Sequence, residues 1–211
     1  MTCEHCCGAD QLFDLETAQK EMKKYKKKGA RKSTRKLLSL MSDFDQSGKT
    51  LLDIGGGIGS IQWSFFQKGG AKTTDIDSSS GYLEVAKSYA QEKGYEVDFR
   101  MADFNDVAED LQSHDFVALD KVVCCYPDYQ LLLGNALDRT GNILALTMPL
   151  GGWISKGLAQ LTKLYLIFKK NPFRTYIHDP KEVHTFMESK GFQLVKKGFS
   201  FPWLVRVYQR V

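Results

Sequence analysis

The chain has 211 residues, of which 43% are hydrophobic, and a formal net charge of +4 at pH 7. This length suits one compact domain with small additions and excludes a second large domain. No apolar run reaches the ~18 residues of a membrane span, and the first residues hold Glu4 and three cysteines where a signal peptide has a basic and an apolar region. We therefore expect a cytoplasmic protein with reduced thiols that does not associate with membranes.

Positive charge is concentrated near the N-terminus. Residues 20–36 contain ten Lys or Arg and one acid, so the rest of the chain is net negative. Apolar residues recur at helical spacing from Leu15 to Tyr25, and a second helix follows the break at Gly29. Residues 1–45 are therefore predicted to form a helical arm or lid. Its basic side is a solvated helix face, a nucleic-acid contact or a lid that attracts an anionic substrate.

A glycine-rich turn follows the first apolar strand of the region 46–211, which we predict to be the main domain. The sequence Lys49-Thr-Leu-Leu-Asp-Ile-Gly-Gly-Gly-Ile-Gly-Ser60 places Asp53 two residues before Gly55, with further glycines at Gly57 and Gly59. Glycines allow the backbone to turn tightly against a ligand at a helix N-terminus. A dinucleotide-binding turn has its third glycine one residue later, and an acid here would repel a pyrophosphate.

Acidic residues also follow the next two predicted strands. The strand 71–76 ends at Asp75-Ile-Asp77, roughly 20 residues beyond the glycines, where a carboxylate can accept from both ribose hydroxyls. We favour Asp77 over Asp75 for this role; the alternative is that Asp77 only caps the following helix. The strand 96–101 is followed by Asp103 and Phe104, an acid–aromatic pair suited to an adenine ring, or else a second helix cap.

A fourth strand, 116–119, runs into a loop over residues 120–128, and a fifth covers 142–147. In an open parallel sheet, ligands bind beyond the carboxyl ends of the strands. The loop 120–128 is therefore the expected catalytic loop. Strands that alternate with helices in this way predict a doubly wound, Rossmann-like α/β sheet. Residues 153–168 are predicted to form an amphipathic helix over the site.

The pattern Asp-x-Gly-x-Gly-x-Gly, followed by acids after the next strands, resembles class I methyltransferases that depend on S-adenosyl-L-methionine (SAM). This resemblance implies a mostly parallel sheet of seven strands, SAM as the methyl donor and S-adenosyl-L-homocysteine (SAH) as the product. The cofactor-binding residues it implies lie in the glycine turn and at the ends of the following strands: Asp53, Gly55, Gly57, Gly59, Asp77, Asp103, Phe104 and Lys121.

Three later segments together resemble the magnesium-protoporphyrin O-methyltransferase type: Cys125-Tyr-Pro127, Phe173–Pro180 and Gly191–Val195. In that group a His-Tyr-Pro triplet follows strand four, and its histidine acts with an N-terminal tyrosine. Here Cys125 replaces the histidine, while Tyr25 is a counterpart of the tyrosine. The resemblance and the residue chemistry make Tyr126, His178, Tyr25 and Cys125 the catalytic candidates; His178 is alternatively a helix-entry residue.

The pair Cys3 and Cys6 has the spacing of metal ligands, but a zinc site needs four and no second pair lies nearby. We predict no metal site, with thiol binding of a metal or a soft metalloid as the alternative. The predicted function is O-methylation of a small, anionic acceptor. Alternatives are methylation of RNA or protein, with nucleic acid as a less favoured partner, and SAM binding without turnover.

Overall fold

Strands and helices alternate along the chain from residue 50 to the end of the fifth strand; two helices and then two consecutive strands follow. The computed structural model describes residues 4–211, apart from the side chains of residues 4–6, 153, 154, 156 and 158. Its strands are β1 (Thr50–Ile54), β2 (Lys72–Asp77), β3 (Val97–Met101), β4 (His114–Asp120), β5 (Thr140–Pro149), β6 (Phe192–Ser200) and β7 (Trp203–Arg210). Its helices are α1 (Glu4–Leu12), α2 (Leu15–Lys28), α3 (Lys32–Met41), α4 (Ser60–Gln67), α5 (Ser80–Lys93), α6 (Phe104–Val107), α7 (Tyr129–Asp138), α8 (Gly152–Phe168) and α9 (Pro180–Ser189).

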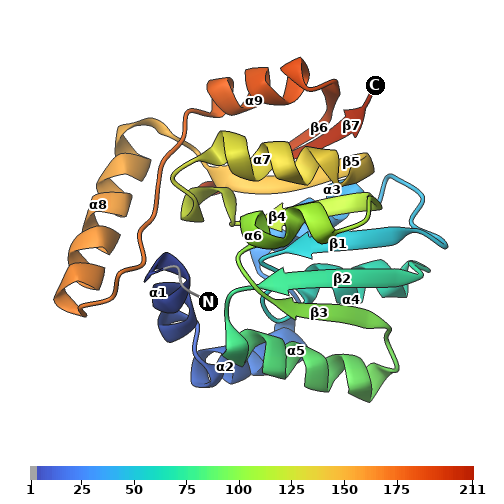
Figure 1. The fold of residues 1–211 in the computed structure, drawn as a ribbon, viewed down its shortest axis with the longest axis horizontal. Coiled ribbons are helices and arrows are strands. Elements are labelled where there is room, and N and C mark those ends of the chain that lie inside the picture. Colours follow the sequence, from blue (N-terminus) through green and yellow to red (C-terminus); the bar gives the residue numbers. More distant parts are fainter. Residues whose placement is uncertain (1–3) are drawn as a thin grey trace.

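The strands form one seven-stranded sheet in the order β3-β2-β1-β4-β5-β7-β6. Strands β1 to β5 pair in parallel, whereas β7 runs antiparallel to both β5 and β6. The carboxyl ends of the parallel strands face the side on which α1 and α8 lie (Figure 1). The predicted doubly wound, mostly parallel sheet of seven strands is confirmed.

Neighbouring residues of a strand point to opposite faces of the sheet, so each strand contributes side chains to both faces. Helices cover both faces and bury these side chains. On one face, Leu52 and Ile54 of β1 belong to a buried cluster that includes residues of α6, α7 and α9. On the other face, Leu51 belongs to a second cluster with residues of α3 and α4. The near-continuous apolar sequence of the central strands follows from this two-sided burial.

The N-terminal helices pack against the main domain through the predicted apolar stripe. Ala18 and Met22 of α2 are buried against Ile58 and Tyr82. Helix α3 contributes Leu37 to the second core cluster. These contacts hold the junction between α2 and α3 close to the carboxyl ends of the strands. None of the helices in the described part of the chain is long and apolar enough to cross a membrane.

Candidate active site

A cavity of about 230 Å³ opens at the carboxyl ends of β1, β2 and β4. Strand order reverses between β1 and β4, which is where open α/β sheets bind their ligands. The glycine turn, the ends of β2 and β3, the loop after β4 and the N-terminal helices all contribute to its lining. Seven of the eight predicted cofactor residues line this cavity, and the eighth, Gly59, adjoins it as the N-cap of α4.

The glycine turn depends on backbone angles that favour glycine. Gly55, Gly57 and Gly59 have φ values of 65°, 58° and 79°. A side chain at Gly59 would also collide with Trp63, whose ring carbon Cζ2 lies 2.2 Å from the position of a Cβ atom. The predicted turn is therefore formed by the residues that the sequence pattern singled out.

Asp53 brings a buried carboxylate to the cavity. Its side chain accepts a hydrogen bond from Gln62 through Oδ2, whereas Oδ1 is buried without a hydrogen-bond partner in the structure. Burial raises the pKa of Asp53 to about 8. An unpaired acceptor of this kind suits a cationic ligand group such as the ammonium of a methionine moiety.

The same Gln62 amide group also donates to Asp75, at 2.7 Å. Asp75 is fully buried, does not line the cavity, and has a pKa raised well above its usual range, mainly by burial. A side chain at Gly56 would meet the Asp75 carboxylate oxygen at 2.5 Å. Asp75 therefore packs against the glycine turn inside the protein, whereas Asp77 lines the cavity.

Asp77 joins the glycine turn to the start of α5. Its Oδ2 accepts from the Gly57 backbone N–H at 2.9 Å, and its Oδ1 accepts from the Ser79 N–H at 2.8 Å. Burial raises the pKa of Asp77, while these backbone donors oppose that shift. A carboxylate has about four acceptor positions, so two of them remain for ligand hydroxyls.

The end of β3 brings Asp103, Phe104 and Tyr126 together. Asp103 caps α6 by accepting from the Asn105 N–H, and its Oδ1 also accepts from the Tyr126 hydroxyl at 3.0 Å. Phe104 lines the cavity from the core. Asp103 is therefore both a helix cap and a residue of the cavity wall, so the two alternatives drawn from the sequence are compatible.

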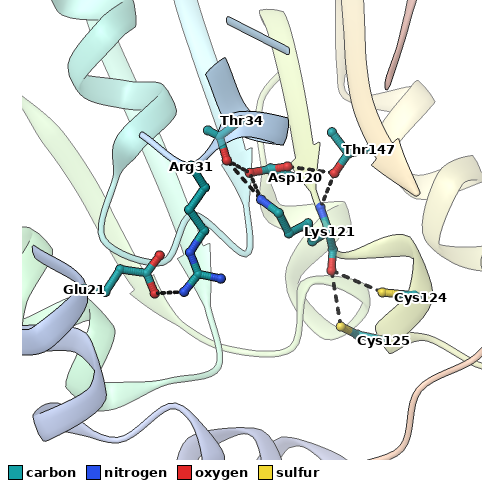
Figure 2. Close-up of polar contacts among 8 residues, drawn as sticks. All are labelled: Glu21, Arg31, Thr34, Asp120, Lys121, Cys124, Cys125 and Thr147. Carbon is teal, nitrogen blue, oxygen red and sulfur yellow. Dashed lines mark hydrogen bonds and ion pairs between the residues drawn. The ribbon is translucent and has the colours of Figure 1, made fainter. Parts of the chain in front are cut away.

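Lys121, directly after β4, has its backbone in the left-handed region, with φ of 68°. Such a conformation costs roughly 1–2 kcal/mol and persists where surrounding contacts impose it. Here the Lys121 N–H donates to Thr147 Oγ1 at 2.7 Å, and Nζ donates to Asp120 at 2.6 Å and to Thr34 of α3 at 3.0 Å (Figure 2). These contacts fix the ammonium group in the cavity wall and link the N-terminal helices to the sheet.

Two adjacent thiols complete this turn. Cys124 and Cys125 both donate to the Lys121 carbonyl oxygen, at 3.4 and 3.5 Å (Figure 2). Cys125 lines the cavity, and its contact with the Cys124 thiol, together with burial, raises its pKa well above the usual range. The Cys125 thiol therefore stays protonated at neutral pH and serves as a donor to the turn.

Sequence reasoning missed a group of residues that the N-terminal helices bring to the cavity. Glu21 of α2 accepts from Arg31 and from the Tyr82 hydroxyl, both at 2.8 Å, and all three line the cavity. Of the ten basic residues between 20 and 36, Arg31 is the one that lines this space. The only sequence signal was the basic segment itself, which did not indicate which cation points inward.

The remaining catalytic candidates lie differently. Tyr126 and Cys125 line the cavity, whereas Tyr25 and His178 do not. The Tyr25 ring packs edge-on against Tyr89 of α5, with ring centroids 6.2 Å apart, and burial raises its pKa to about 12. His178 Nε2 donates to the Tyr126 carbonyl oxygen at 2.9 Å, so it contacts the loop that follows β4.

The N-terminal cysteine hypothesis is not resolved by the structure. Cys3 and the side chain of Cys6 lie outside the described residues, and Cys7 is an exposed free thiol. Within the described part of the chain, no cluster of His, Cys, Asp or Glu side chains has the arrangement of a metal site. The predicted helix over residues 153–168 is present as α8; none of its described side chains lines the cavity, and those of residues 153, 154, 156 and 158 lie outside the described residues.

Comparisons with known proteins agree on one family. A family model described as a methyltransferase domain matches residues 45–191. The ubiquinone biosynthesis O-methyltransferase of Coxiella burnetii (strain Dugway 5J108-111) is 26% identical over 161 residues, covering 70% of this chain and 65% of that protein. The chain thus spans slightly less than two thirds of that relative.

Solved structures give the same fold. The magnesium protoporphyrin IX methyltransferase of Synechocystis PCC 6803 with bound SAH has a TM-score of 0.68 at 18% identity, covering 96% of this chain and 85% of that one. A putative RNA methyltransferase from Pyrococcus horikoshii has a TM-score of 0.61 at 13% identity, with 83% of both chains covered. At such identities the similarity establishes the fold.

Proposed function

This chain belongs to the methyltransferase-domain family, and from that premise we propose that it transfers the methyl group of SAM to an oxygen atom of a small, anionic acceptor. The family match confirms the class I methyltransferase resemblance seen in the sequence. The observation that carries the proposal is that three carboxylates from the ends of successive strands, Asp53, Asp77 and Asp103, line one cavity.

These three carboxylates suit a SAM molecule, which carries a sulfonium and an ammonium charge. Asp53 offers its unpaired Oδ1 to the ammonium, Asp77 offers its two remaining acceptor positions to the ribose hydroxyls, and Asp103 lies beside Phe104 for the adenine. No described basic side chain forms an ion pair with Asp53 or Asp77. These two acids thus remain available to a cationic ligand.

Two further acids line the same cavity, and each is already paired with a base: Glu21 with Arg31, and Asp120 with Lys121. Paired cations still attract a carboxylate, because an arginine presents several donors and a lysine three. Arg31 and Lys121 are therefore proposed to bind carboxylates, from the methionine end of SAM, from the acceptor or from both.

SAM supplies an already activated methyl group, so the protein has to align the acceptor oxygen and exclude water. A neutral hydroxyl acceptor would need a base, yet no histidine is among the described residues that line the cavity. The Cys125 thiol has a raised pKa and does not serve as a base. This combination favours an acceptor oxygen that is already ionised, such as a carboxylate.

The test is methyl transfer from labelled SAM to three acceptor pools: extracted small acids and phenols, RNA, and protein. The proposal predicts label in the small-molecule pool as an ester that alkali releases. Label that resists alkali would indicate an ether and contradict the carboxylate acceptor. Label in RNA or protein would support methylation of macromolecules instead, and tight SAH binding with no labelled product would indicate binding without turnover.

A further inference from the structure

Helix α8 exposes a stripe of large apolar side chains. Leu161, Leu164 and Phe168 are 65%, 64% and 88% exposed, and Tyr165 and Ile167 beside them are also exposed. A helix turns about 100° per residue, so these positions centre on the side opposite Leu166, which is 1% exposed. The stripe therefore faces away from the protein, where an unpartnered apolar surface marks an interaction site.

The charged residues of this segment of the chain have one sign. Residues 139–178 contain no Asp or Glu, and the described lysines of this region, Lys163, Lys169 and Lys170, are exposed. Lys163 and Lys169 lie on the two flanks between the apolar stripe and the buried side. An apolar helix face with flanking lysines and no acids is complementary to a surface that is apolar inside and negative at its rim.

The position of α8 relates this surface to the cavity. The helix lies beyond the carboxyl ends of the parallel strands, beside α1 (Figure 1). Its buried residue Leu166 packs in one cluster with Ala9 and Phe173, and both of these line the cavity. A surface that covers the stripe would thus lie at the end of the molecule that holds the cavity.

We propose that the exposed stripe of α8 docks onto the surface of an anionic lipid bilayer, with the helix lying in the plane of the headgroups. This proposal departs from the expectation, drawn from the sequence, of no membrane association; that expectation rested on the lack of a spanning run, and a helix in the headgroup plane does not span the bilayer. A second copy of the chain is a poorer occupant, because a symmetric contact through α8 would bring its lysines against the same lysines of the partner. The inference does not depend on methyl transfer.

The experiment is flotation of the full chain with two kinds of vesicle, one of phosphatidylcholine alone and one containing phosphatidylglycerol. Binding is expected to the anionic vesicles and to fall as salt rises. The double variant Leu164→Ser/Phe168→Ser is expected to lower the partition coefficient at least about tenfold. The matched variant Leu131→Ser/Phe199→Ser removes exposed apolar residues elsewhere, 52% and 53% exposed, and is expected to bind as the unmodified chain does.

Two outcomes would overturn the proposal. The basic N-terminal helices are a rival membrane contact, so loss of binding in Lys23→Gln/Lys24→Gln with retention in Lys169→Gln/Lys170→Gln would assign the contact to α2. A dimer that sedimentation detects without lipid, and that Leu164→Ser/Phe168→Ser converts to a monomer, would assign the stripe to a second copy. Thermal unfolding of each variant checks that it is folded.

Discussion

Binding of SAH is predicted to release a proton from Asp53. In the free protein, burial raises the pKa of this carboxyl to about 8, so Asp53 is mostly neutral at pH 6–7. The ammonium of SAH would favour the ionised form, because its charge replaces the solvation that burial removed. Each pH unit below the pKa then opposes binding by about 1.4 kcal/mol, so SAH affinity should rise about tenfold between pH 6 and pH 7.

Calorimetry in buffers with different ionisation enthalpies measures this proton directly. Release close to one proton per SAH is expected between pH 6 and 7. Methylthioadenosine, which lacks the amino-acid end, is the matched control and should bind without this release. Asp53→Asn should weaken SAH binding and abolish its pH dependence. An affinity for SAH that does not change with pH, with no proton released, would refute the reasoning.

The stability of the free protein provides an independent check on the same carboxyl. The folded-state pKa of Asp53 lies above its ordinary value of 3.8. Its contribution to stability is therefore fully present below that ordinary value and is lost as the pH rises towards about 8. Asp53→Asn should raise the unfolding temperature at pH 8 relative to the unmodified chain and change it little at pH 3.5.

Three further substitutions test the cavity. Asp77→Ala removes acceptors for two charge-assisted hydrogen bonds of ~1.5–3 kcal/mol each, so it should weaken SAH binding at least about tenfold in a calorimetric titration. The control Asp98→Ala, on β3, should leave SAH binding unchanged. Gly59→Ala adds a clash with Trp63 to a left-handed backbone and should lower the free energy of unfolding in urea by about 2–4 kcal/mol. Gly94→Ala is the control: its added Cβ atom has no neighbour within 4 Å, so it should cost about 1 kcal/mol. If Arg31 binds the cofactor carboxylate, Arg31→Met should lower the affinity for SAH and leave the affinity for methylthioadenosine unchanged. Unchanged SAH binding would indicate that Arg31 binds the acceptor instead.

The part of the cavity that the strand ends form was largely predictable from the sequence. Its residues follow the ends of successive strands, and parallel strands bring those ends to one edge of the sheet. The strand pattern of β1, β2 and β4 therefore predicts that Asp53, Asp77 and Lys121 line one cavity, as they do. Local signals suffice here because the glycine turn and the strand ends are themselves local features.

The residues that the N-terminal helices bring to the cavity were not predictable in the same way. Arg31, Glu21 and Tyr82 meet because α2 packs along α5, a contact between segments far apart in the sequence. Tyr25 continues the apolar stripe of α2, and that stripe is used for packing against Tyr89. Helical periodicity identifies the buried face of a helix, but it does not say which distant surface that face will meet.

The most direct test of the central claim is a calorimetric titration of the purified chain with SAH and, separately, with NAD. The three carboxylates that line the cavity, Asp53, Asp77 and Asp103, predict saturable binding of one SAH per chain. They also predict that NAD, with its anionic pyrophosphate, does not bind there. No binding of SAH, or equal binding of NAD, would contradict the assignment of this cavity to SAM.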